Sequence, residues 1–254
     1  MSSPSNQPFS GHVAIVTGAG SGIGRATALA LARAGANVLG VGRRKDALDE
    51  TARAHANIEV LSVNLVEDGA PAQVVGTAVE RWGRLDLLVN NAGGTAVMPL
   101  AEADKQVIAD LFHLNVVVPS MLAHEALPHL RTSSGSIVNV SSTYGHRPMA
   151  GGSHYSATKA AIEQMTRSWA LELAADGIRV NCVAPGPTRT DVMLAAGLTP
   201  EAVNDMYAYE QARIPTHRIA DVDDIAHWIL RMAEPAGRQA TGQVITVDGG
   251  LELI

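Results

Sequence analysis

The sequence predicts a single α/β domain whose parallel sheet is covered by helices on both faces. Short apolar segments rich in β-branched residues or leucine alternate many times with segments of helical periodicity. The strand candidates are apolar at odd and even positions alike, as expected of strands buried on both faces. No stretch rich in proline, glycine and serine interrupts the alternation, so the 254 residues are expected to form one domain.

Seven segments are expected to be strands: residues 12–17, 37–42, 58–63, 85–90, 135–140, 177–183 and 243–248. Helical periodicity marks the segments between them, at residues 22–34, 45–55, 68–82, 104–130, 153–175 and 221–233. Residues 1–10 lack the basic start and apolar run of a signal peptide. We therefore expect a disordered tail over 1–10 and one domain over 11–254.

Composition and charge exclude several classes of function. The chain is 46% hydrophobic and 17% charged, and no apolar run approaches the about 18 residues of a membrane span, so a soluble globular protein without a membrane partner is expected. A net charge of -6 gives no basic footprint for nucleic acid. Cys182 has no disulfide partner and is expected in the core, which makes the cytoplasm the expected location. The nine histidines show no metal-ligand spacing, and His146 and His154 are expected at the surface or along a pocket.

A glycine-rich turn, TGAGSGIG at residues 17–24, joins the first strand candidate to a helix rich in alanine and leucine. Free backbone N–H groups and the positive end of the helix dipole point at whatever such a turn holds, so the position suits a pyrophosphate. The spacing G-x-x-x-G-x-G differs from the usual dinucleotide fingerprint G-x-G-x-x-G. A tight turn that only packs the helix is the alternative for this motif taken alone.

The second strand candidate ends in the segment NVLGVGRRKD, residues 37–46, which runs into three consecutive cations. A dinucleotide site for NAD(H) carries an acidic residue here, about 20 positions after the turn, to bind a ribose hydroxyl. This chain has Gly42 and Arg43 instead. Arginine offers a planar fork of donors that matches a 2′-phosphate, so NADP(H) is favoured over NAD(H). A solvated helix start is the alternative.

The strongest signal is the segment YSATK, residues 155–159, preceded by Ser141 and Ser142. Residues four apart share one face of a helix, so Tyr155 and Lys159 are expected to stand side by side. Reduction of a ketone needs a hydride from one side and a proton from the other, and Tyr155 is the expected proton donor. The Lys159 ammonium would favour its phenolate. Ser142 would hydrogen-bond the substrate oxygen as charge develops on it.

Together these motifs resemble the classical short-chain dehydrogenase/reductase family over nearly the whole chain. The matching elements stand in the family's order: TGAGSGIG (17–24), NNAG (90–93), Asn115 in LNV, SS (141–142), YSATK (155–159), PGPTRT (185–190) and VDGG (247–250). The resemblance implies a doubly wound Rossmann-type sheet of seven strands in the order 3-2-1-4-5-6-7, a homotetramer, and interconversion of a carbonyl and an alcohol with a nicotinamide cofactor.

The family's catalytic tetrad maps onto Asn115, Ser142, Tyr155 and Lys159. Ser142 is preferred to Ser141 because the family places its serine 13 positions before the tyrosine. The resemblance further implies that the lysine holds the nicotinamide ribose and that the asparagine kinks its helix to place a water. Together with Arg43 and Arg44, the expected cofactor contacts are Gly18, Ser21, Gly22, Ile23, Gly24, Asn64, Leu65, Asn91, Ala92, Gly93, Tyr155, Lys159, Pro185, Gly186, Thr188 and Thr190.

Two positions depart from the family's pattern: Asn64 stands where aspartate is usual, and Thr158 stands where serine is usual. Asn64 keeps an acceptor for the adenine amino group, so at most a modest loss of cofactor affinity is expected. Walls of the substrate pocket are expected from residues 94–100, 143–154 and 190–216. The last segment is expected to be a mobile lid, or else a helix packed on the core, and its methionines and leucines favour an apolar or acyl-bearing ketone.

Other functions remain open at this point. One is an NAD(H)-preferring alcohol dehydrogenase of the same family. Another is an NADP(H)-binding regulator without turnover, against which the intact Tyr155 and Lys159 argue. A third is a dehydratase or epimerase, whose relatives usually carry a substantial C-terminal substrate domain, whereas few residues follow VDGG here.

Overall fold

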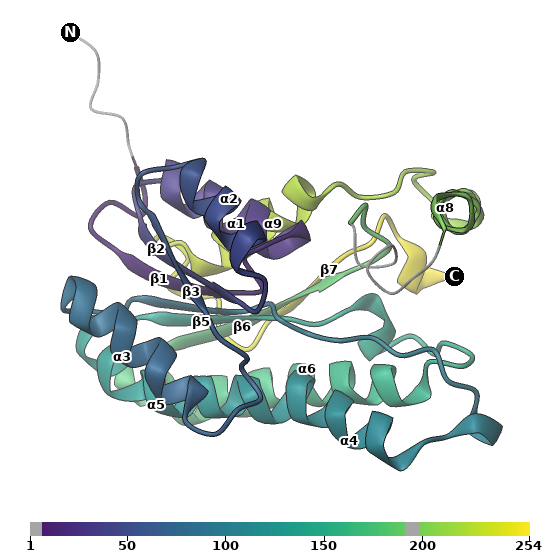
Figure 1. The fold of residues 1–254 in the computed structure, drawn as a ribbon, viewed down its shortest axis with the longest axis horizontal. Coiled ribbons are helices and arrows are strands. Elements are labelled where there is room, and N and C mark those ends of the chain that lie inside the picture. The colour runs from purple at the N-terminus through teal and green to yellow at the C-terminus, as the bar shows by residue number, and fades with distance from the viewer. Residues whose placement is uncertain (1–6, 191–198) are drawn as a thin grey trace, which may run out of the picture.

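Seven parallel strands form one sheet in the order β3-β2-β1-β4-β5-β6-β7, in a computed structural model that describes residues 7–190 and 199–254. This order confirms the predicted doubly wound Rossmann fold, and Figure 1 shows the sheet between two layers of helices. The strands are β1 (Val13–Thr17), β2 (Asn37–Gly42), β3 (Ile58–Ser62), β4 (Leu87–Asn90), β5 (Ser136–Val140), β6 (Arg179–Pro185) and β7 (Val244–Val247). All seven expected strands are present, each within two residues of its predicted ends.

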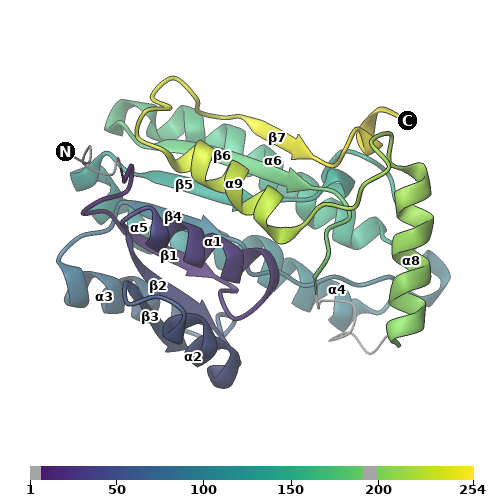
Figure 2. The same cartoon turned by 90° about the horizontal axis from the view of Figure 1, so that it is seen from above.

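The helices cover both faces of the sheet (Figure 1). One face carries α1 (Gly22–Arg33), α2 (Lys45–Arg53) and α9 (Val222–Ala233). The opposite face carries α3 (Ala70–Trp82), α4 (Lys105–Phe112), α5 (Val118–Ser133) and α6 (Ser153–Leu173). A further helix, α8 (Pro200–Arg213), stands at the edge of the molecule beside the C-terminus, as Figure 2 shows.

The apolar strands divide their side chains between two cores because successive strand residues point to opposite faces. In β1, Val13 and Ile15 pack into the core under α3 and α5, whereas Ala14 and Val16 pack into the core under α1 and α9. Strands that must fill both cores leave no face for polar residues. This is why the strand segments are apolar at odd and even positions alike.

The predicted helix over 104–130 is interrupted, which is a correction to the sequence-based boundaries. A π-helical turn at His113–Val117 separates α4 from α5. The side chain of Asn115, at the centre of this turn, bonds Gly94 and Thr158 instead of pointing to solvent. These contacts come from segments distant in sequence, so local periodicity carried no sign of them.

The helical stretch Lys105–Ser133 is long and apolar enough to cross a membrane by length and composition. Three of its apolar side chains, Leu122, Ala126 and Leu130, are buried in the core under the sheet. One third of the most apolar part of this stretch is buried in this way.

Two further expectations need correction or fall outside the described residues. Residues 7–10 are not part of a tail, because Phe9 is 3% exposed, packs in the core and donates from its amide to the carbonyl of Ala34 at 3.1 Å. The lid predicted over 190–216 includes residues 191–198, which lie outside the described residues. Its remainder forms α8 and the turn that follows it.

Candidate active site

A cavity of about 1080 Å³ lies at the carboxyl ends of the strands. The chain turns back here: β2 and β3 lie on one side of β1, and β4 to β7 lie on the other. Open α/β sheets bind ligands at this reversal of strand order. The predicted site residues that line the cavity are Gly18, Ser21, Gly22, Ile23, Arg43, Arg44, Asn64, Leu65, Asn91, Ala92, Gly93, Ser142, Tyr155, Lys159, Pro185, Gly186, Thr188 and Thr190.

The glycine turn leaves the first turn of α1 open toward the cavity. Within the described residues, no side chain caps this helix at Ser21. Gly18 has a φ of +71°, and a Cβ there would lie 2.7 Å from the side-chain nitrogen of Asn91. Gly24 was also expected to contact the cofactor, but it does not line the cavity. It packs against the glycine turn, where a Cβ would collide with the carbonyl of Gly18. The uncapped helix end suits a pyrophosphate, and Gly24 supports the turn from behind.

Two cations lie at the end of the cavity formed by β2 and the glycine turn. Arg43 and Arg44 both line it and both are exposed. Arg44 donates from its guanidinium to the Ser21 hydroxyl at 2.8 Å. Among the described lining residues, the only carboxylates are Asp110 and Glu210, which belong to α4 and α8. This end of the cavity is therefore positive.

The segment after β4 is fixed against β1 by a single threonine. The Thr17 hydroxyl accepts from the amides of Asn91 and Ala92, at 3.0 and 2.9 Å. The Asn91 side chain donates to the carbonyl of Thr17 at 2.8 Å. These bonds hold the backbone of residues 91–93 along the cavity between the glycine turn and α6.

Tyr155 and Lys159 stand one turn apart on α6 and both face the cavity. The Lys159 ammonium lies 5.8 Å from the centre of the Tyr155 ring and donates to the carbonyl of Val140 at 3.0 Å. Lys159 is only 7% exposed. The structure thus brings Tyr155 and Lys159 together at the cavity, as the spacing on one helix face predicted.

Asn115 is buried behind this pair and does not line the cavity. Its side-chain oxygen accepts from the amide of Gly94 at 2.8 Å, and its nitrogen donates to the Gly94 carbonyl and the Thr158 hydroxyl at 3.0 Å each. In the structure, Asn115 thus joins the π-helical turn to the segment after β4 and to α6. A π-helical turn inside an α-helix frequently marks a functional site.

Ser142 and Ser141 have different surroundings, although both line the cavity. Ser141 donates its hydroxyl to the Glu163 carboxylate at 2.8 Å and to the Lys159 carbonyl at 3.1 Å. Ser142 accepts from the amide of Tyr144 at 3.2 Å, which leaves its hydroxyl proton free to donate. The choice of Ser142 as the substrate-facing serine stays a prediction, and this difference between the two serines favours it.

The loop after β6 closes the cavity from the other side. Gly186 packs so tightly that a Cβ there would lie 2.5 Å from the Asp248 side chain. The Tyr207 hydroxyl, from α8, donates to the Thr188 carbonyl and accepts from the Thr190 amide, each at 3.1 Å. Thus α8 holds the loop that carries Thr188 and Thr190.

The substrate end of the cavity contains residues that the sequence-based walls missed. Asp110, His113 and Leu114, from α4 and the π-helical turn, line it. The only available signal was their position within five residues of Asn115. The predicted wall segments contribute Gly94, Thr95, Val97, Tyr144, Met149, Thr190, Met206, Tyr207 and Glu210, of which Thr190 was also predicted as a site residue.

Burial raises the pKa of two ionisable groups near the site. Burial raises the pKa of the Tyr144 phenol, and the Glu210 carboxylate adds to this effect. Burial also raises the pKa of the Cys182 thiol to about 12, with a smaller contribution from Glu163. The unionised Cys182 is buried, as expected of a core residue. Neither His146 nor His154 lines the cavity, and the described residues contain no cluster of metal ligands.

A doubly wound sheet, a glycine turn open at a helix end and a lysine–tyrosine pair in one cavity define a dinucleotide-binding oxidoreductase. A family model described as enoyl-(acyl carrier protein) reductase matches residues 18–252. The chain is 35% identical to the 3-oxoacyl-[acyl-carrier-protein] reductase of Thermotoga maritima, over 95% of this chain and 98% of that protein. It is 38% identical to the cis-4-hydroxycyclohexanecarboxylate dehydrogenase of Sinomonas cyclohexanicum, over 96% and 98%.

Two further proteins are similar over nearly their whole length. The L-xylulose reductase of Mesocricetus auratus is 36% identical over 95% of this chain and 97% of that protein. A short-chain dehydrogenase/reductase of unknown function from Caenorhabditis elegans, solved with cofactor, superimposes with a TM-score of 0.92 at 31% identity, covering 97% of both chains. The chain belongs to the short-chain dehydrogenase/reductase family. It is an oxidoreductase that acts on a small-molecule alcohol or carbonyl with a nicotinamide cofactor.

Proposed function

We propose that the protein uses NADP(H) to interconvert a ketone, or the 3-oxo group of an acyl compound, and the corresponding alcohol. The observation that carries the proposal is one cavity with Tyr155 and Lys159 at one end and Arg43 and Arg44 at the other. The first pair supplies acid and base chemistry, and the second pair supplies recognition of a phosphate.

In this reaction, Tyr155 gives a proton to the carbonyl oxygen as the alcohol forms and takes it back in the reverse direction. The bound nicotinamide supplies or accepts the hydride. Lys159 stabilises the phenolate that remains on Tyr155 after proton transfer. Ser142 donates a hydrogen bond to the same substrate oxygen, which stabilises the charge that develops there.

Recognition of the adenosine 2′-phosphate falls to Arg43, with help from Arg44. Both side chains are exposed at the cavity, and no carboxylate among the described lining residues lies at that end. A charge-assisted pair of hydrogen bonds from one guanidinium holds a phosphate by its geometry as well as by charge. NAD(H) lacks the 2′-phosphate that these two guanidinium groups would bind.

The substrate is proposed to be an uncharged, partly apolar ketone. Val97, Leu114, Met149 and Met206 supply apolar surface to this end of the cavity. The carboxylates of Asp110 and Glu210 repel an anionic group brought close to them. Reductases of a 3-oxoacyl compound and of a sugar are both among the relatives, so the relatives alone do not choose between these substrates.

The proposed assembly is a homotetramer in the cytoplasm. Val117 at the end of the π-helical turn is 45% exposed, and Met121 on α5 is 42% exposed. The small residues Ala157 and Ala160 on α6 are also exposed. Small exposed residues let a helix approach another helix closely. Trp169, on the same helix, packs against the core of its own subunit.

Oxidation of NADPH, followed at 340 nm against a panel of ketones, acyl thioesters and quinones, tests the proposal. We expect turnover with at least one ketone or 3-oxoacyl compound. Binding of NADPH without turnover of any panel member, in either direction, would identify the protein as a cofactor-binding regulator instead.

A further inference from the structure

Glu163 is a buried carboxylate that the proposed reaction does not use. It lies on α6, four residues after Lys159, and its side chain is 4% exposed. It does not line the cavity. A buried carboxylate is costly unless hydrogen bonds and an opposite charge compensate it, so its partners indicate what it does.

Those partners come from the loop that carries Ser142. The Glu163 carboxylate accepts the Ser141 hydroxyl at 2.8 Å and lies 3.1 Å from Nδ1 of His146. Gly145 lies between them, and a Cβ there would collide with the carboxylate and lie 2.9 Å from the Ser141 hydroxyl. The loop therefore packs directly on Glu163, and only glycine fits at position 145.

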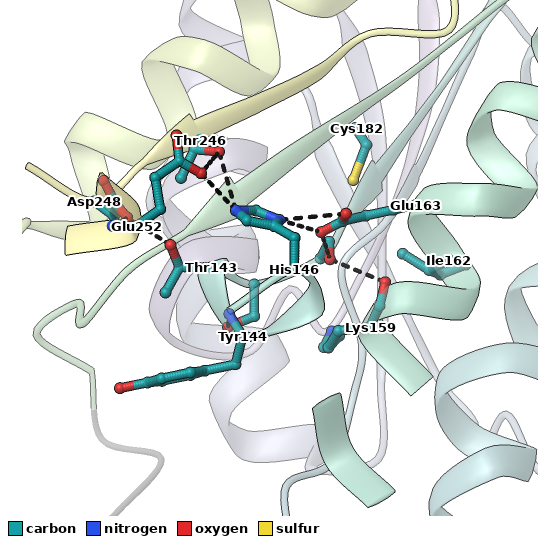
Figure 3. Close-up of polar contacts among 12 residues, drawn as sticks. Thr143, Tyr144, His146, Lys159, Ile162, Glu163, Cys182, Thr246, Asp248 and Glu252 are labelled. Atoms are coloured by element: carbon teal, nitrogen blue, oxygen red, sulfur yellow. Dashed lines mark hydrogen bonds and ion pairs between the residues drawn. The ribbon is translucent and has the colours of Figure 1, made fainter. Parts of the chain in front are cut away.

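His146 connects this buried carboxylate to the C-terminal turn (Figure 3). Its Nε2 lies 2.6 Å from a carboxylate oxygen of Glu252, which also accepts the Thr246 hydroxyl at 2.8 Å. Both ring nitrogens thus face carboxylates. The His146 ring therefore joins the two carboxylates, one through each ring nitrogen.

The same loop is tied to the C-terminal residues at two more points. Thr143 donates its hydroxyl to Asp248 at 2.5 Å, and Arg147 donates to the terminal carbonyl of Ile254 at 3.0 Å. Ser142 and Tyr144, which lie on either side of Thr143 in the chain, both line the cavity. The segment 141–147 is therefore fixed by contacts with Glu163 and the C-terminal residues, while two of its side chains face the cavity.

We propose that Glu163, His146 and Glu252 form a chain of positioning residues that fixes the serine loop from the C-terminal turn. The chain sets the orientation of Ser142, and none of its three members touches the substrate. This inference rests on the proposed function for its kinetic readout, because it assigns the three residues to the same site. Misplacing a catalytic group by about 1 Å costs up to about 100-fold in rate, so loosening the loop lowers kcat.

The test compares Glu163→Gln, His146→Gln and Glu252→Gln with Glu172→Gln, a control that makes the same change at an exposed position on α6. We expect the first two variants to lose about 10-fold in kcat and Glu252→Gln about 3-fold, with the Kd for NADPH within twofold of the parent. The control should match the parent. Because His146 and Glu252 act in series, the double variant His146→Gln/Glu252→Gln should be no slower than His146→Gln alone.

Hydrogen exchange of peptides covering residues 141–147 provides a readout that needs no substrate. We expect faster exchange there in all three variants and unchanged exchange in Glu172→Gln. Parent-like kcat and exchange in folded His146→Gln and Glu252→Gln would overturn the proposal, even if Glu163→Gln fails to fold. If the parent reduces no carbonyl, the proposed function fails while the exchange result still decides whether the chain fixes the loop.

Discussion

Arg44 and Ser21 are joined by a hydrogen bond of 2.8 Å that ties the end of β2 to the glycine turn. The bond brings together, along one wall of the cavity, two segments that are about 20 residues apart in the sequence. Arg43 lies next to this bond and lines the same wall. The choice between NADP(H) and NAD(H) is therefore expected to depend on Arg43, Arg44 and the residues beside them.

Replacing Gly42 with Asp and Arg43 with Ser should reverse the cofactor preference. The new carboxylate repels a 2′-phosphate and accepts the ribose hydroxyls of NAD(H), and a Cβ at Gly42 would meet its nearest neighbour, Leu48, at an ordinary 3.6 Å. Loss of the charge-assisted pair should weaken NADPH binding by about 10-fold to 150-fold in a fluorescence titration. Lys45→Ser, which removes a cation paired with Asp49 outside the cavity, is the control and should bind like the parent.

The variant Tyr155→Phe should lose kcat by about 100-fold or more, which is typical of removing a general acid. Only the hydroxyl is removed, so the Kd for the cofactor should stay within a few fold. Steady-state kinetics alongside a binding titration separate the two effects. Tyr209→Phe, at a residue that is 62% exposed, should behave like the parent. Equal kcat in Tyr155→Phe and the parent would show that Tyr155 is not the acid.

Cys182 should be unreactive toward thiol reagents while the protein is folded. Burial raises the pKa of its thiol from 9.0 to about 12, so the folded protein keeps this proton at pH values where the unfolded chain has lost it. The free energy of unfolding should accordingly fall as pH rises from 9 toward 12. A disulfide-exchange reagent at pH 8 should detect one thiol in denaturant and none without it. Rapid modification of the native protein would contradict this.

Light scattering at micromolar concentration should report a tetramer. The variant Met121→Lys places a charge on the exposed apolar face of α5 and should shift the mass toward a smaller species. His227→Lys, an exposed position on α9 on the opposite face of the sheet, should leave the mass unchanged. A monomeric parent would rule out the proposed assembly.

The sheet could be predicted well from the sequence because its signal is local. In β1, the apolar run that fills both cores is visible in five consecutive residues. The spacing of Tyr155 and Lys159 is equally local, since helix geometry alone places them on one face. The placement of Tyr155 beside Lys159 and the glycine turn could therefore be predicted before any coordinates.

Features that depend on distant contacts could not be predicted in this way. Asn115 interrupts its helix through bonds to residues 21 and 43 positions away. Phe9 is buried because it packs against α1. His146, on the loop that carries Ser142, contacts Glu252, which lies 106 positions later in the chain. No local pattern marks His146 as the residue that connects these parts.

The ratio of kcat/KM for NADPH to that for NADH, measured with one accepted ketone, tests the central claim most directly. We expect NADPH to be favoured by about 10-fold or more, because Arg43 and Arg44 bind its 2′-phosphate and no neighbouring carboxylate binds the ribose of NADH. A ratio of one or less would contradict the assignment. The cations at residues 43–45 would then be a solvated helix start with no role in cofactor choice.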